Sequence, residues 1–345
     1  MKYIIGIIGL LIIGMVFAWY QTTPPTRSSE KVDVIIEKGD NYHVLAEKLK
    51  AENVIRSELL FKAYLRLNLP DSLQACRYEL DRSWTYSEIV TAIEKDCNFS
   101  DEVVNVTIPE GRTLTRAAAI VADVIVADAD EILQVWTSEE FIDEVIEKYD
   151  FANDSIKNND IVYALEGYLF PSTYELLNVN VSPEYVAFRM LDQTARIYEK
   201  YAAEIADHQF SFHEILTLAS IVEHEGILDE DLPKIASVFY NRLSINMPLQ
   251  SCATLGYALG EWKAVYTGAD TQVDHPYNTY INRGLPPGPG NMPGERSIMA
   301  VLNPATTNYY YFLANVCDSD DNQTYFSRTL SEHEQKRSQF DLSCE

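Results

Sequence analysis

The stretch SFHEILTLASIVEHEG, residues 211–226, predicts a helix that packs into the core of the fold. Ser211 and Glu214 have the spacing of a capping box, so we expect a helix to begin directly after Ser211. Apolar residues then recur at three- and four-residue steps, which is typical of a helix that packs into a core. Glu223 falls on this apolar face, and Gly226 can end the helix. The helix is therefore expected to hold one carboxyl group against aliphatic side chains.

This setting suggests a chemical role for Glu223. A carboxyl group among aliphatic side chains has its charged form disfavoured, which suits a general acid. The alternative is an ion pair that ties helices together, for example with Arg242. Glu225 either orients a neighbouring group or is solvated. His224-Glu225 begins like the zinc motif H-E-x-x-H, but the second histidine is missing and no G-x-S-x-G occurs, so we expect no metal, cofactor or serine nucleophile.

Composition limits the partners of the chain. Its 345 residues are 47% hydrophobic, enough for a real core in two or three domains. Acidic residues outnumber basic ones by 52 to 27, for a formal charge of −25. A surface this negative repels the phosphates of nucleic acid, so nucleic acid is excluded as a partner.

The N-terminus predicts a membrane anchor. Residues 3–20 carry no charge, and as a helix they would span about 27 Å, close to the thickness of a bilayer core. We expect residues 1–24 to form a cytoplasmic tail and a single transmembrane helix in the inner membrane, with the bulk of the chain on the periplasmic side. The alternative is a cleaved signal peptide that ends at Ala18.

The five cysteines fit an exported chain but match no zinc pattern. Cys76 and Cys97 are the pair to test for a disulfide, and five independent thiols are the alternative.

Behind a polar linker at 25–31, residues 32–98 predict a small β/α module. We expect a strand near 32–36, then a helix with Val44, Leu45 and Leu49 on one face, a short strand at 76–80 and a helix at 85–95. The module as a whole has the order β-α-α-β-α. This layout resembles LysM, a small fold that binds glycans rich in N-acetylglucosamine. Residues 99–205 read as a second β/α and helical connecting region, and residues 206–345 as a largely helical catalytic domain. The fold class is therefore α+β.

The segment LEGYLFPSTYEL, residues 165–176, gathers three aromatic side chains around Glu166. It is either an aromatic wall for a sugar ring or part of the core. Further polar and aromatic groups suited to acetamido sugars lie at Gln250, Tyr277, Asn278, Thr279 and Tyr280.

The order of motifs in the C-terminal half is specific. It runs SIVEHE, SVFYNRL with MPLQS, PYNTY with GLPPGP, AVLNP and FSRTLSEH. Over roughly residues 160–335 this order resembles the YceG-like family of membrane-anchored endolytic murein transglycosylases, and the expected anchor and LysM-like module fit the same architecture.

The resemblance implies a function. Glu223 would be the catalytic acid and base. Apart from the resemblance, Glu225, Arg242 and Glu166 are candidates for supporting residues, and Arg242 could either pair with a buried carboxylate or contact a carboxylate of the peptide stem. The enzyme would cleave the bond between N-acetylmuramic acid and N-acetylglucosamine in nascent peptidoglycan strands, leave a 1,6-anhydromuramoyl end and limit strand length, with peptidoglycan synthases as implied partners. A single carboxyl group suffices because the sugar's own C6 hydroxyl attacks C1.

Two alternatives stay open. One is a membrane-anchored peptidoglycan-binding scaffold without activity, and the other is a hydrolytic muramidase. The muramidase would need a second carboxylate, for which the sequence offers Asp229, Glu230, Asp231 and Asp274. One departure from the family pattern bears on this choice, because Cys252-Ala253 stands where members typically carry Asp-Pro.

Overall fold

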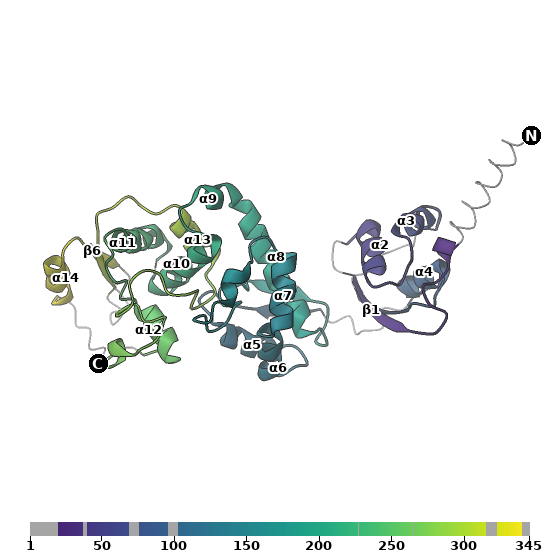
Figure 1. Ribbon diagram of the computed structural model, residues 1–345, viewed down its shortest axis with the longest axis horizontal. Helices are drawn as coiled ribbons and strands as arrows, with labels where there is room; N and C mark the ends of the chain where they lie inside the picture. Colours follow the sequence, from purple (N-terminus) through teal and green to yellow (C-terminus); the bar gives the residue numbers. More distant parts are fainter. Residues whose placement is uncertain are drawn as a thin grey trace, which may run out of the picture. The chain divides into compact units, whose positions relative to one another are not determined.

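The computed structural model describes residues 20–36, 40–68, 76–95, 103–226, 228–263, 265–314 and 323–339 (Figure 1). They fall into two compact units, residues 1–104 with 177–179 and residues 105–176 with 180–345. Apart from Tyr20, the expected membrane span at 3–20 lies outside the described residues, as does Cys97 of the cysteine pair. In the described part, no helix combines the length and the apolar character needed to cross a bilayer.

Unit 1 has the strand and helix order expected for residues 32–98. Its elements are β1 (Lys31–Ile36), α2 (Tyr42–Ala51), α3 (Glu58–Leu67), β2 (Cys76–Asp81) and α4 (Tyr86–Lys95). The two strands are antiparallel, from Lys31 opposite Asp81 to Ile36 opposite Cys76. Alternate strand residues such as Val34 and Tyr78 enter a core that the helices complete. The predicted β-α-α-β-α order is confirmed.

Unit 2 is mixed helix and sheet, and its first half carries a small sheet beside several helices. The elements are β3 (Val104–Thr107), α5 (Leu114–Ala122), α6 (Ala129–Trp136), α7 (Glu139–Lys148), η1 (Asp154–Lys157), β4 (Thr173–Leu176), α8 (Pro183–Lys200) and α9 (Ala202–Asp207). Strand β3 pairs with β4. Both belong with the C-terminal half in one compact unit, which is a coarser division than the predicted one. The predicted boundary near residue 205 stays a prediction.

The second half of unit 2 carries the motifs. Its elements are α10 (Phe212–Glu225), η2 (Asp229–Asp231), α11 (Leu232–Ser244), α12 (Cys252–Leu259), η3 (Asp270–Gln272), α13 (Glu295–Leu302), β5 (Tyr311–Ala314), β6 (Thr324–Ser327) and α14 (Leu330–Arg337). Strands β5 and β6 form an antiparallel pair, and α14 packs against both.

Helix α10 is the centre of this half. It packs against α11, α12 and α13, which gather around it in Figure 1. The predicted capping box is present, since the Ser211 hydroxyl accepts from the Glu214 amide and the Glu214 carboxylate accepts from the Ser211 amide. Its buried residues run without a break from Ile215 to Val222, so the middle of the helix is buried on every side. The expectation of a single apolar face was too narrow.

We expect Ser211→Ala to lower the free energy of unfolding by about 1 kcal/mol, because it removes the side-chain acceptor at the start of α10. Urea denaturation of the chain from residue 25 onward measures the change. Ser244→Ala is the control, since Ser244 is an exposed serine at the end of α11. Equal stability of the two variants would contradict the role given to the cap.

Candidate active site

The site is built at the C-terminal end of α10, where Glu223 and Glu225 leave the core. Residues two apart on an α-helix point about 200° apart around its axis. The two carboxylates therefore face different surroundings, and the structure gives each of them different partners.

Glu223 faces the start of α13. Its Oε2 accepts a hydrogen bond from the Gly294 amide at 3.0 Å and another from the Ser297 hydroxyl at 2.7 Å. Gly294 is the N-cap of α13 and has no side chain of its own to cap that helix, so Glu223 supplies the missing acceptor. The expected apolar groove around Glu223 is not found, because two donors and a helix N-terminus surround this carboxylate. The expected alternative, an ion pair with Arg242, is also absent from the described residues.

The loop that begins α5 closes this side of α10. Gly111 has a φ of +72°, a left-handed conformation that favours glycine. Its amide donates to the Met292 carbonyl at 2.8 Å, and the Met292 amide donates back to Arg112 at 2.8 Å. This exchange brings Gly111 beside the Glu223 side chain. Glu223 is half-buried and thereby lies between the 111 loop and α13.

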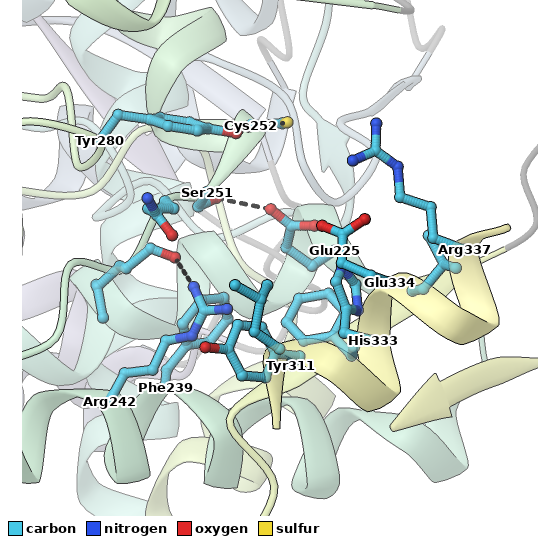
Figure 2. A pocket seen from close by; sticks show the side chains of 15 residues that line it. Glu225, Phe239, Arg242, Ser251, Cys252, Tyr280, Tyr311, His333, Glu334 and Arg337 are labelled. Atoms are coloured by element: carbon cyan, nitrogen blue, oxygen red, sulfur yellow. Dashed lines mark hydrogen bonds between the residues drawn. The ribbon is translucent and has the colours of Figure 1, made fainter. Parts of the chain in front are cut away.

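Glu225 faces a cavity of about 440 Å³, which Figure 2 shows from close by. Its Oε1 accepts a hydrogen bond of 2.7 Å from the Ser251 hydroxyl. Ser251 is the N-cap of α12 and accepts from the Ala253 amide with the same oxygen, so its only proton is directed at Glu225. The residues that line the cavity are Glu225, Phe239, Arg242, Leu249, Gln250, Ser251, Cys252, Tyr280, Tyr311, Phe312, Leu313, Leu330, His333, Glu334 and Arg337. Glu223 is not among them.

Two of the predicted sugar-binding residues reach this cavity. Gln250 is exposed, and its backbone has a φ of +49°, a conformation held by a hydrogen bond of 3.1 Å from its amide to the Thr279 carbonyl. Tyr280 places its hydroxyl 3.4 Å from the Cys252 sulfur. The cavity therefore offers an amide, a phenol and a carboxylate along one wall.

The other three predicted sugar-binding residues are buried. Tyr277, Asn278 and Thr279 are at most 1% exposed. The Asn278 amide donates to the carbonyls of Thr271 and Val273 at 3.2 and 2.8 Å, while the Thr279 hydroxyl accepts from the Ser251 amide at 3.1 Å. Direct contact with a sugar is not supported for these three residues. They hold the loop that presents Gln250 and Tyr280.

Arg242 is a buried cationic residue that lines the cavity, and it is only 8% exposed. Its Nε donates to the Tyr310 carbonyl at 2.7 Å and its Nη1 to the Leu249 carbonyl at 2.6 Å. Burial lowers the pKa of its guanidinium group. Arg242 is therefore not in an ion pair among the described residues, and it joins α11 to Leu249 and to Tyr310, the residue before β5.

Glu166 is wholly buried, 0% exposed, and distant in sequence from the cavity residues. Its Oε1 accepts from the Leu114 amide at 2.8 Å and its Oε2 from the Tyr257 hydroxyl at 3.1 Å. Burial raises the pKa of this carboxyl group to about 8, against the two hydrogen bonds, which lower it. Glu166 thus joins the start of α5 to α12 and supports the fold rather than lining the cavity.

The aromatic segment around Glu166 belongs to the core. Tyr168, Phe170 and Tyr174 are at most 9% exposed, and the Tyr168 hydroxyl lies 2.9 Å from His213 Nδ1. Of the two interpretations of residues 165–176, core packing is the one confirmed.

Sequence reasoning missed the contribution of α14. His333, Glu334 and Arg337 line the cavity from this helix, and Tyr311 does so from β5. The motif FSRTLSEH lies here, but its spacing alone does not say that its helix packs against β5 and β6 and lines the same cavity as Glu225.

Comparison with known proteins assigns the family. The model of the YceG-like family matches residues 34–339. A Bacillus subtilis protein named endolytic murein transglycosylase is 34% identical over 334 residues, which cover 96% of this chain and 91% of that protein. A protein of the same name from Streptococcus pneumoniae D39 is 32% identical over 327 residues, 89% of this chain and 59% of that protein.

A solved structure agrees with these matches. The crystal structure of a yceG-like protein from Listeria monocytogenes, 36% identical, superposes with a TM-score of 0.63 and covers 90% of this chain and 100% of that one. The fold therefore recurs in a related chain. This chain belongs to the YceG-like family.

We expect Glu166→Gln to remove part of the pH dependence of stability. Because the folded-state pKa of Glu166 lies near 8 and the usual value is 4.5, the stability that its protonated form contributes is complete below pH 4.5 and lost as the pH rises to about 8. Glutamine keeps the acceptor for Leu114 and does not ionise. One pKa unit corresponds to about 1.4 kcal/mol, so between pH 5 and 8 wild type should lose at least that much more stability than the variant. Urea titrations at both pH values measure the difference, and parallel losses in the two proteins would refute the assignment.

Proposed function

We propose that the chain is an endolytic peptidoglycan lytic transglycosylase and that Glu225 is its acid and base. The observation that carries this proposal is the place of the Glu225 carboxylate, which faces the 440 Å³ cavity beside Gln250 and Tyr280. Hydroxyl and amide groups of this kind suit acetamido sugars, and the rings of tyrosine suit stacking against them. Relatives named endolytic murein transglycosylase support the same substrate class.

Glu225 is preferred to the predicted Glu223 because its side chain lines the cavity and that of Glu223 does not. Both hydrogen bonds of Glu223 engage Oε2 and stabilise a helix N-terminus, a task that a structural carboxylate performs without reacting. Each carboxylate is held through one oxygen, Oε2 in Glu223 and Oε1 in Glu225. Only Glu225 lines the cavity, so its Oε2 can exchange a proton with a ligand there. A catalytic role for Glu223 stays a prediction, and it is the second possibility that the experiment below separates.

The chemistry needs one carboxyl group. Glu225 in its acid form donates a proton to the oxygen between C1 of N-acetylmuramic acid and C4 of N-acetylglucosamine, and that C1–O bond breaks. The carboxylate then accepts the proton of the C6 hydroxyl of the same muramic sugar, whose oxygen forms the new bond to C1. The products are a 1,6-anhydromuramoyl end and a free 4-hydroxyl, and Glu225 returns to its acid form. Because the attacking group is part of the substrate, proximity replaces a positioned water.

One observation favours hydrolysis as the alternative. A muramidase needs a second carboxylate across the cleft. Asp229 pairs with Arg296 and Asp231 with Lys234, away from the cavity, but Glu334 lines the cavity from α14. If Glu334 activates a water, the product is a reducing end.

The N-terminal unit supports glycan binding. Its β-α-α-β-α order is that of the LysM-like module expected from the sequence, and a pocket of about 220 Å³ lies between the start of α2 and the end of α3, lined by Asn41, Tyr42, His43, Lys62, Leu65 and Arg66. We place the enzyme in the inner membrane through residues 3–20, with its two units on the periplasmic side and synthases as partners. In that position it would act on nascent strands and limit their elongation.

Mass spectrometry of digested, uncrosslinked glycan strands tests the assignment. General acid–base catalysis contributes roughly 100-fold or more, so Glu225→Gln should lower the cleavage rate by at least that factor. Glu223→Gln keeps an acceptor for Gly294 and Ser297 and should stay within a few-fold of wild type. Both variants need unfolding midpoints close to wild type.

Each pattern of products has a meaning. Anhydromuramoyl ends from wild type and from Glu223→Gln support the proposal. The reverse pattern, with activity lost only in Glu223→Gln, would move the acid to Glu223. Reducing ends would identify a muramidase, and strands bound but uncut by wild type would identify a scaffold.

Deleting residues 3–20 should release the protein from the membrane, because these residues are the proposed anchor. Fractionation of cells that make the full and the shortened chain measures this. A shortened chain that still resists extraction with carbonate would overturn the anchor.

A further inference from the structure

The end of the cavity formed by α14 carries charges that the proposed sugar chemistry does not use. Arg242, Glu334 and Arg337 line this end together with His333, and Figure 2 shows Arg337 and Glu334 projecting from α14 on the side of Glu225. N-acetylglucosamine and the ring of N-acetylmuramic acid are neutral. A ligand that matches this wall must carry charges of its own.

Arg242 is the first observation that points to an anionic ligand group. It is buried, and backbone carbonyls occupy its Nε and Nη1. Among the described residues no carboxylate lies within ion-pair distance of it, although the chain has 52 acidic residues. Glu225 acts on Arg242 only beyond ion-pair distance. A buried guanidinium is costly without an anion bonded to it, and carboxylates are the groups that its planar fork binds best.

Helix α14 presents the other charges from a fixed position. A capping box between Thr329 and Glu332 begins the helix, and Lys336 donates to the Phe326 carbonyl of β6. The ring of His333 stacks on Tyr311 with centroids 5.4 Å apart. Its Nδ1 is buried and has no hydrogen-bond partner in the described part of the chain. The helix is therefore anchored, while His333 Nδ1 lacks a partner among the residues that the structure describes.

Arg337 and Glu334 are also without ion pairs among the described residues, and both are exposed. They stand three residues apart and so lie on one face of α14. One positive and one negative group side by side match a ligand that carries a carboxylate and an ammonium group close together.

We infer that this end of the cavity binds the peptide attached to the muramic sugar, with a peptide carboxylate against Arg242 and Arg337 and a peptide ammonium group beside Glu334. The inference rests on the proposed function, because it makes the peptide part of the substrate. In murein the lactyl group of muramic acid carries a short peptide with free carboxylates and, at a diamino acid, an ammonium group. The enzyme therefore distinguishes peptide-bearing strands from bare glycan.

The test compares two substrates, uncrosslinked strands that bear peptides and the same strands after an amidase has removed the peptides. Charge-assisted hydrogen bonds are the strong ones, and 1.4 kcal/mol corresponds to tenfold. Wild type should therefore cleave peptide-bearing strands with a kcat/KM about tenfold higher or more. Arg337→Gln should bring this ratio close to one, and Glu334→Gln should lower it.

Arg328→Gln is the matched control. It removes the same charge from the turn before α14, but Arg328 does not line the cavity, so the ratio should stay at the wild-type value. Arg242 is left intact in these tests because its hydrogen bonds hold β5 in place.

Three results would overturn the inference. The first is an equal kcat/KM of wild type for both substrates. The second is an Arg337→Gln variant that loses the same factor on both, since removal of the peptide frees the lactyl carboxylate and the arginines would then bind that group. The third is a control variant that lowers the ratio as far as Arg337→Gln does.

A failure of the proposed function is distinguishable. If wild type cleaves neither substrate, calorimetric binding of the two strands replaces the rates. A tenfold tighter binding of peptide-bearing strands that Arg337→Gln abolishes supports the peptide site even then, and equal binding of both strands overturns it.

Discussion

Burial of α10 on every side is the constraint on which the site depends. Its neighbours α11, α12 and α13 fix its axis and its rotation, and the capping box at Ser211 fixes where it begins. The packing therefore also fixes the directions in which the side chains of the last turn point. Glu223 meets the amide end of α13, and Glu225 meets the cavity. Two carboxylates that differ by two positions in the chain thereby receive different tasks from the packing of one helix.

The cavity is organised by side chains that do not line it. Asn278 and Thr279 are buried. Asn278 donates to backbone carbonyls of its own loop, and the Thr279 hydroxyl accepts from the backbone amide of Ser251. This arrangement holds Ser251 where its hydroxyl meets Glu225. Because the polar groups are in place before a ligand arrives, little reorganisation is needed on binding, which is the condition under which such groups contribute most to catalysis.

Much of the fold could be predicted because it follows from local patterns. The capping box at Ser211, the strands of unit 1 and the helix at 85–95 depend on residues close together in the chain, and the structure confirms them. The site depends on contacts between distant segments. Helical periodicity assigns a residue to a face, but a helix buried all round has no polar face to orient it. The helical periodicity of the apolar residues therefore could not predict that Glu223 faces Gly294.

Residue type alone also could not predict the roles of Tyr168 and Tyr277. An aromatic ring with a hydroxyl suits both a sugar-binding wall and a core, and only the burial of these two side chains decides. Arg242 was expected to pair with a carboxylate, but it donates its hydrogen bonds to the backbone carbonyls of Tyr310 and Leu249. The role of α14 depends on how the pair of β5 and β6 packs against α11, which no local pattern encodes.

The most direct test of the central claim is a crystal structure of the Glu225→Gln variant with a short uncut GlcNAc–MurNAc strand. The account predicts that the glycosidic oxygen lies at hydrogen-bond distance from the side chain of residue 225, within about 2.6–3.2 Å, with the strand passing Gln250 and Tyr280. A strand whose glycosidic oxygen instead meets Glu223, on the α13 side of the helix, would contradict it.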